Sequence, residues 1–179
     1  YGALLTQGLR ECASGDRTKG IGTFEQAIAL RPDQAAAHAH LGSALRDTGD
    51  MSRALAPLLR AVEIYDHDTE QWAVQLGTYF FTHMAAAAGA PPLPSLLQTL
   101  DARVGVAERC VAAAPKSMQC WAMLGMSLAE QGGDPARAAS AFMKAAGLTD
   151  VPTTRNGYLA FARSLLQPTA PASDAVQVG

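Results

Sequence analysis

The chain has 179 residues, of which 49% are apolar and 6% aromatic, and its formal net charge is −2. A chain of this length can bury one sizeable core or form a solenoid of about five short repeats. The small net charge excludes the broad basic field that binds nucleic acid or an anionic membrane, so we expect neither as a partner.

The cysteine content and the absence of a long apolar run bear on the compartment. Three cysteines without regular spacing argue against the disulfide framework of a small secreted protein. The sequence lacks a run of about 20 apolar residues that could insert into a membrane. It begins at Tyr1, within a helical pattern and without a leader. We therefore expect an intracellular, cytoplasmic protein whose N-terminus is trimmed, with an organelle as the alternative.

Residues 35–65 carry the pattern that the rest of the chain repeats. Small residues stand where two helices would approach, and large ones stand between them; in order these are Leu41, Gly42, Leu45, Ala54, Leu58 and Ala61. Such spacing is typical of two closely packed antiparallel helices. It resembles a tetratricopeptide (TPR) repeat, although His38 stands where the family prefers an aromatic residue and Asp66 where it prefers proline.

This resemblance implies an all-α fold: a right-handed α-α superhelix, or TPR-like solenoid, with a C-terminal capping helix. We predict a single domain over residues 1–167 and a flexible tail over 168–179. The predicted parts of the domain are repeats at about 1–34, 35–68, 69–117 and 118–151 and a capping helix over 154–167. Gly15-Asp16 and Gly49-Asp50 recur in step as turns, where glycine ends one helix and aspartate caps the next.

The third repeat departs from the pattern. Its Leu76-Gly77 pair is preceded by Trp72, which comes one residue too early. Either this repeat has a one-residue insertion or its register differs by one. A proline-rich insertion over 89–95 cannot continue a helix. After it, the capping-box spacing of Ser95 and Gln98 predicts a helix from near Leu96 to Ala114.

The fourth repeat follows the family pattern most closely in its first helix, with Trp121 ahead of Leu124-Gly125. Asp134 and Pro135 form a well-defined start for its second helix. The amphipathic segment that follows is placed to cover the last apolar face of the stack.

In this family the first helices line a concave groove, so the resemblance implies which residues face a partner. They are Leu5, Leu9, Ser43, Arg46, Val74, Thr78, Phe81, Gln119, Met126 and Glu130. This lining is mixed and mostly small or apolar, which suits a helix or extended peptide that binds by shape and apolar anchors. The alternative for Leu5 and Leu9 is that they cover an adjacent repeat absent from this sequence.

Two known activities of the family are not expected. Some members bind the acidic C-terminus of chaperones through a clamp of Lys, Asn and Arg, but Leu5, Leu9 and His40 occupy clamp positions here. Sugar-transferase relatives carry a ladder of asparagines along the groove. Its positions hold other residues in this chain: Thr6, His40, Gln75 and Met123.

Catalytic and metal-binding patterns are also missing from the sequence, so we expect no enzyme, no metal and no cofactor. His38 and His40 project to nearly opposite sides of a helix, which favours a packed ring and a surface ring over a metal site. His67 fits a solvated turn. Cys110 and Cys120 flank the Pro115 turn, and a buried pair of thiols is favoured over a disulfide.

These features together favour a scaffold for protein–protein interaction or assembly that binds a peptide or helix of a partner protein in the groove. Two alternatives remain open. The chain could be a permanent structural subunit of a large complex, or a docking or regulatory domain of a larger enzyme.

Overall fold

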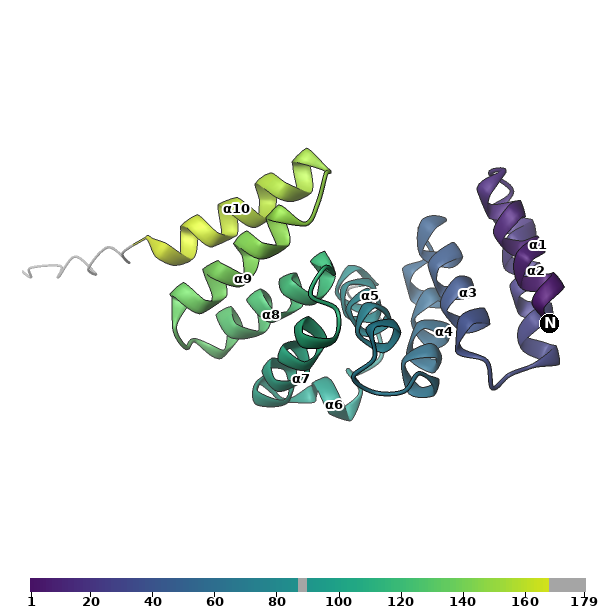
Figure 1. The fold of residues 1–179 in the computed structure, drawn as a ribbon, viewed down its shortest axis with the longest axis horizontal. Coiled ribbons are helices and arrows are strands. Elements are labelled where there is room, and N and C mark those ends of the chain that lie inside the picture. Colours follow the sequence, from purple (N-terminus) through teal and green to yellow (C-terminus); the bar gives the residue numbers. More distant parts are fainter. Residues whose placement is uncertain (87–89, 168–179) are drawn as a thin grey trace, which may run out of the picture.

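A computed structural model describes residues 1–86 and 90–167, which form helices joined by short connections, with no strand among them. The helices are α1 (Gly2–Ala13), α2 (Arg17–Leu30), α3 (Ala35–Asp47), α4 (Met51–Ile64), α5 (Glu70–Ala86), α6 (Ser95–Gln98), α7 (Leu100–Ala113), α8 (Met118–Gln131), α9 (Pro135–Gly147) and α10 (Pro152–Leu166). Figure 1 shows them following one another along an elongated, curved stack, with α1 at one end and α10 at the other. The expected all-α solenoid is confirmed.

The turns inside the first two helix pairs form as the sequence predicts. Gly15 and Gly49 have φ angles of +92° and +86°, a region that side chains other than glycine rarely adopt. The carboxylates of Asp16 and Asp50 then accept a hydrogen bond from the backbone N–H three residues on, at 3.2 and 3.1 Å. Each glycine thus ends one helix and each aspartate starts the next.

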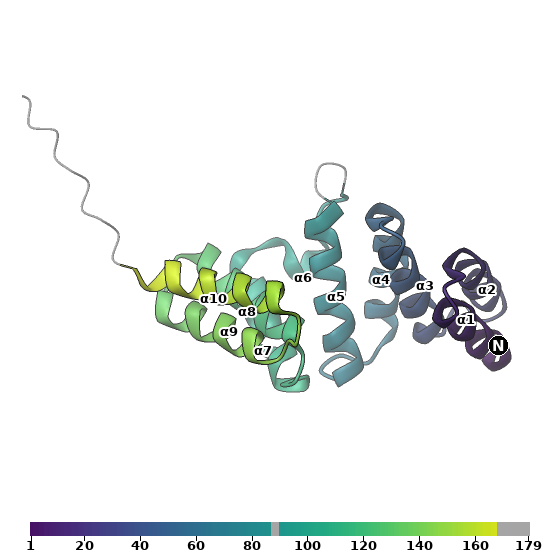
Figure 2. The ribbon, with the colours of Figure 1, turned by 90° about the horizontal axis from the view of Figure 1, so that it is seen from above.

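The first and last helices close the two ends of the stack. Figure 2 shows α1 and α2 side by side at one end and α9 and α10 at the other. Helix α10 begins at Pro152, two residues before the predicted start, and packs on α9 with Ala162 against Phe142 in a small apolar cluster. It therefore covers the apolar face that α9 would otherwise expose, as expected of a capping helix.

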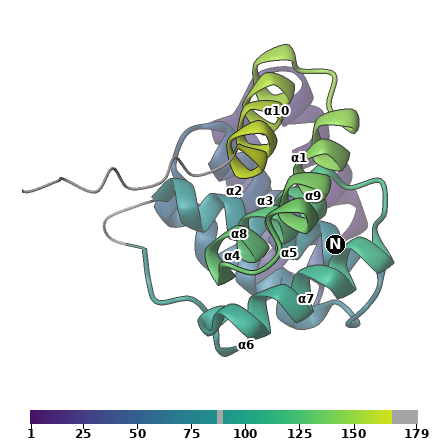
Figure 3. The ribbon, with the colours of Figure 1, turned by 90° about the vertical axis from the view of Figure 1, so that its left-hand side faces the viewer.

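The single helix expected from near Leu96 to Ala114 is a wrong prediction, because the structure contains two helices there. Thr99 has extended backbone angles (φ −95°, ψ 153°) and separates α6 from α7. Its hydroxyl accepts a hydrogen bond from the N–H of Ala102 at 3.2 Å, which makes Thr99 the N-cap of α7. Ser95 makes no capping bond. Figure 3, a view along the stack, shows α6 at its outer edge, opposite α10.

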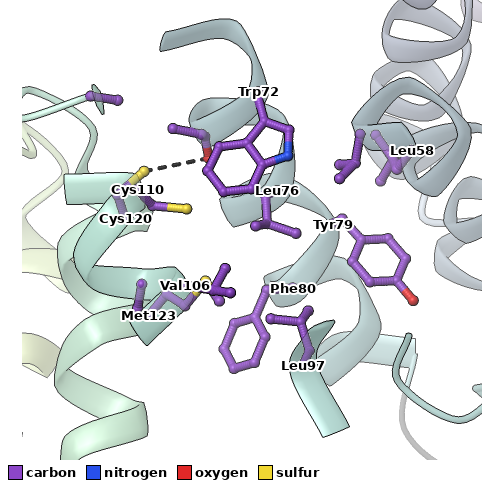
Figure 4. Packing of buried hydrophobic residues seen from close by; sticks show 14 of the residues in the cluster. Leu58, Trp72, Leu76, Tyr79, Phe80, Leu97, Val106, Cys110, Cys120 and Met123 are labelled. Carbon is purple, nitrogen blue, oxygen red and sulfur yellow. Dashed lines mark hydrogen bonds between the residues drawn. The ribbon is translucent and has the colours of Figure 1, made fainter. Parts of the chain in front are cut away.

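The centre of the core lies around α5. Trp72, Leu76 and Phe80 are each at most 1% exposed and point toward α7 and α8, whereas Tyr79 points toward Leu58 of α4 (Figure 4). Each fully buried side chain of this size contributes roughly 1.5–3 kcal/mol before conformational entropy is counted. Helix α5 therefore joins the two halves of the stack.

Several sequence expectations fall on residues that are not described. The tail over 168–179 lies outside the described residues, as does Gly89 of the proline-rich insertion. The repeat limits given above stay a prediction. Within the described part of the chain, no helix combines the length and the apolar character needed to cross a bilayer.

Candidate partner-binding groove

Three hollows follow one another between the first helices of the pairs and share residues at their borders. The α1–α3 hollow, of about 150 Å³, and the α3–α5 hollow, of about 390 Å³, have His40 and Ser43 in common. The α3–α5 hollow and the α5–α8 hollow, of about 340 Å³, have Glu70 and Val74 in common. Because neighbouring hollows share lining residues, we describe all three as one groove.

Most of the residues that line the α3–α5 hollow have polar side chains. The hollow is lined by Ala39, His40, Ser43, Tyr65, Glu70, Gln71, Val74 and Gln75. The His40 ring stacks on Phe24 at a centroid distance of 5.5 Å, and burial lowers the pKa of this histidine. The imidazole is therefore neutral at pH 7, and Glu70 supplies the hollow's formal charge.

A fourth hollow, the α8–α10 hollow, is apolar and has a volume of about 360 Å³. It is lined by Phe81, Met126, Ala129, Glu130, Phe142, Tyr158, Phe161, Ser164 and Leu165. Phe142 of α9 forms its floor, where it stacks on Tyr158 and Phe161 at centroid distances of 6.1 and 5.6 Å. Phe161 nevertheless remains 61% exposed. Such an apolar surface is stabilised when a partner covers it.

Most of the residues predicted to face a partner line one of these hollows. Leu9 and Ser43 border the α1–α3 hollow, and Val74 and Gln119 border the α5–α8 hollow. The α8–α10 hollow brings together the last three members of the set: Phe81, Met126 and Glu130. Their role in binding stays a prediction.

Three members of the predicted set lie elsewhere. Thr78 is only 7% exposed, and its hydroxyl donates a hydrogen bond to the carbonyl of Val74 at 2.9 Å, so it presents little to a partner. Leu5 is partly buried against the core. Arg46 lies 3.8 Å from the carboxylate of Asp47, beside the groove and not among its lining residues.

The residues that sequence analysis missed come from two sources. Tyr158 and Phe161 belong to α10, which the sequence marks as a cap and not as a binding element, although two aromatics on a terminal helix are a usable signal. Tyr65 and Glu70 lie at the ends of α4 and α5, and only the turn between these helices brings both to the α3–α5 hollow.

The histidines and cysteines outside the groove have structural surroundings. The Nε2 of His38 lies 2.9 Å from the carbonyl of Pro32, which can only accept, so this nitrogen carries the proton. Cys110 and Cys120 are both free and fully buried, and their mutual hydrogen bond, together with burial, raises the pKa of Cys110. Within residues 1–86 and 90–167, no three potential metal-ligating side chains come together.

Comparison with known proteins shows the class of protein to which this chain is similar. A family model described as tetratricopeptide repeat matches residues 5–69. Tetratricopeptide repeat protein 36 of Mus musculus is 42% identical over 62 residues, and its Homo sapiens counterpart is 40% identical over 62 residues. Each match covers 35% of this chain and 33% of the relative, so the chain spans about a third of the length of these relatives.

Solved structures extend the similarity in fold to most of the chain. MamA from Desulfovibrio magneticus RS-1 superposes with a TM-score of 0.61 at 16% identity, covering 91% of this chain and 83% of that one. TTC0263, a thermophilic TPR protein of Thermus thermophilus, gives 0.58 at 17% identity, with 92% and 82% covered. YrrB, a TPR protein described as having an unusual peptide-binding site, gives 0.58 at 13% identity, with 91% and 84% covered.

The helical pairs, their glycine crossings and the groove define an α-helical repeat scaffold of the kind that mediates protein–protein interaction. Residues 5–69 match the tetratricopeptide repeat family model, and the described helices share the fold of solved TPR proteins.

Proposed function

We propose that this protein binds a peptide or helical segment of a partner protein along the groove, with an apolar side chain of that segment anchored in the α8–α10 hollow. The observation that supports this is the hollow itself: Phe81 and Met126 line it together with Phe161, which is 61% exposed. A concave, apolar hollow of this volume accommodates a large side chain and excludes water from it.

The stacking of the helices places the residues of the α8–α10 hollow on different elements. Phe81, Met126 and Phe161 come from α5, α8 and α10, so a ligand in the hollow contacts three separate helices. Each of these helices is held by a neighbour, which limits the entropy lost on binding. The YrrB likeness, in fold alone, is consistent with a peptide ligand for such a scaffold.

A peptide-display selection on the purified protein tests the proposal. Peptides selected on the wild type are synthesised and their affinities measured for Met126→Ala and Phe161→Ala. We expect each variant to lose about tenfold or more in affinity, because a buried side chain of this size is worth roughly 1.5–3 kcal/mol.

Met143→Ala is the matched control. Met143 is 48% exposed on α9 and lines none of the four hollows, so its removal should leave the affinity unchanged. Peptides that bind Met126→Ala and Phe161→Ala as tightly as the wild type would show that the anchor lies elsewhere.

A further inference from the structure

Gln75 marks the α3–α5 hollow as an incomplete polar site. Its side chain is 7% exposed and lines the hollow, and its amide Nε2 is buried without a hydrogen-bond partner. A buried donor left unpaired destabilises the folded protein. Most such groups in proteins are paired, so an acceptor from outside the chain is the natural complement of this amide.

Further polar groups converge on the same hollow. Ser43, Tyr65 and Gln71 line it, and in the part of the chain that the structure describes none of these side chains bonds to another protein group. Hydroxyls both donate and accept, and amides offer one group of each kind. A peptide backbone also carries one donor and one acceptor per residue, so these side chains can pair with the backbone of an extended chain.

The carboxylate of Glu70 in the α3–α5 hollow favours a peptide with a basic side chain. Glu70 is exposed, lies in the first turn of α5 and forms no ion pair within the described residues. In the adjoining α5–α8 hollow Glu70 is accompanied by Lys116 and by Asp150, and Asp150 lies 3.8 Å from Arg155. Among the residues that line the α3–α5 hollow itself, Glu70 is the one that carries a formal charge, which favours a cation and disfavours a carboxylate there.

We infer that the α3–α5 hollow binds an extended segment of the partner that carries a Lys or Arg side chain. The cationic head pairs with Glu70, and a backbone carbonyl of the segment accepts a hydrogen bond from the Gln75 amide. This inference rests on the proposed function, because it assigns to the same bound segment a second contact, in the groove, in addition to the apolar anchor in the α8–α10 hollow. It gives the partner's segment a basic residue in addition to an apolar one.

The same display selection, sequenced in depth, tests this assignment. We expect Arg or Lys to be enriched at one position of the peptides selected on the wild type, and this enrichment to disappear on Glu70→Gln and to be replaced by Asp or Glu on Glu70→Lys. For one synthetic peptide and its Arg→Ala or Lys→Ala version, Glu70→Gln should weaken the basic peptide about fivefold and leave the neutral one unchanged.

Two further variants separate a specific pair from a general effect of charge. Glu63 is a carboxylate on α4 that pairs with Arg60 and lines none of the hollows, so Glu63→Gln should change neither the enrichment nor the affinity. Gln75→Leu should weaken basic and neutral peptides alike by about tenfold, because a backbone carbonyl is common to both. Melting temperatures verify that every variant is folded.

The outcomes distinguish this inference from the proposed function. If the wild type selects peptides that depend on Met126 and Phe161 but show no basic preference, the inference is overturned and the proposed function stands. If it selects none, both are overturned. A dimer of the wild type that Glu70→Lys dissociates would assign the hollow to a second copy of this chain and would also overturn the inference.

Discussion

The glycine of the Leu-Gly motif makes different contacts in the third helix pair (α5 and α7) from those in the second (α3 and α4) and fourth (α8 and α9), which are called the regular pairs below. In the regular pairs the glycine of the first helix faces a large side chain of the second. A Cβ on Gly42 would lie 2.5 Å from Leu58, and one on Gly125 would lie 3.1 Å from Phe142. In the third pair, a Cβ on Gly77 would instead lie 3.0 Å from Gln119 of α8. The same Leu-Gly motif therefore joins two neighbouring pairs here.

The aromatic position shows the same difference. His38 and Trp121 each place a ring nitrogen 2.9 Å from the carbonyl of the proline six residues earlier, Pro32 and Pro115. His38 thus performs the function of the family's aromatic residue. The Nε1 of Trp72 is buried without a partner, and its ring lies under the guanidinium of Arg109 at 5.2 Å from the ring centroid. Trp72 precedes Leu76 by four residues, whereas Trp121 precedes Leu124 by three, and one residue corresponds to about 100° of helix rotation.

Removing a large side chain from α5 should have the largest effect and should distinguish a central helix from a terminal one. Phe80→Ala and Phe24→Ala each delete a buried ring, at 0% and 1% exposure, and each should cost about 3–5 kcal/mol of unfolding free energy. Hydrogen exchange should rise in α4, α7 and α8 for Phe80→Ala, but only in α1–α3 for Phe24→Ala. If both variants raised hydrogen exchange equally and only close to the substituted residue, the central position of α5 would be contradicted.

Adding a methyl group at the glycines tests which contacts they permit. Gly42→Ala should destabilise by about 1–3 kcal/mol, because the new Cβ meets both the side chain and, at 3.2 Å, the backbone nitrogen of Leu58. Gly77→Ala should cost less, since its nearest neighbour is 3.0 Å away. Gly22 in α2 has open space around it, so Gly22→Ala is the control and should stabilise by about 0.5–1 kcal/mol. Chemical denaturation measures all three.

The equivalence of His38 and Trp121 can be tested by exchange. His38→Phe removes the donor to the Pro32 carbonyl and should cost about 0.5–1.5 kcal/mol. His38→Trp supplies the same N–H as Trp121 and should retain most of the stability. If both variants lose the same amount in denaturation experiments, the ring nitrogen is not what the position requires.

The smallest effect is expected at the contact that joins the turn before α5 to α7. Arg109 donates hydrogen bonds to both carboxylate oxygens of Asp68, at 2.6 and 2.9 Å, and these bonds lower the pKa of Asp68. This contribution to stability is present above the ordinary pKa of 3.8 and is lost as the pH falls through the lowered value. Asp68→Asn should therefore lower the melting temperature slightly at pH 7, and this difference should shrink as the pH falls below 3.8.

Asparagine is the suitable replacement because residue 68 has a φ of +63°, which asparagine tolerates. A difference in melting temperature that persists unchanged at pH 2 would assign the effect to the backbone and not to the ion pair.

The sequence predicted the paired helices and the caps of α2 and α4, where a short-range rule governs them. Asp16 and Asp50 cap as expected because capping depends on neighbours three residues away. The break at Thr99 was missed because a capping threonine also fits a helix interior, and only the packing of α6 and α7 separates the two. Phe81 and Met126 of the α8–α10 hollow follow the repeat and were named from the sequence, whereas Tyr158 and Phe161 do not follow it and were not.

By itself, the sequence determined that this protein is a stack of paired helices, because small residues recur where backbones touch and turn residues recur between them. Only the tertiary structure decided the orientation of α5, since a rotation of one residue preserves every local preference and is settled by contacts with α4, α7 and α8 together. That orientation puts Gly77 against α8 and brings Glu70, Val74 and Gln75 to the groove. The α3–α5 hollow exists because helices distant in the sequence hold α5 from both sides.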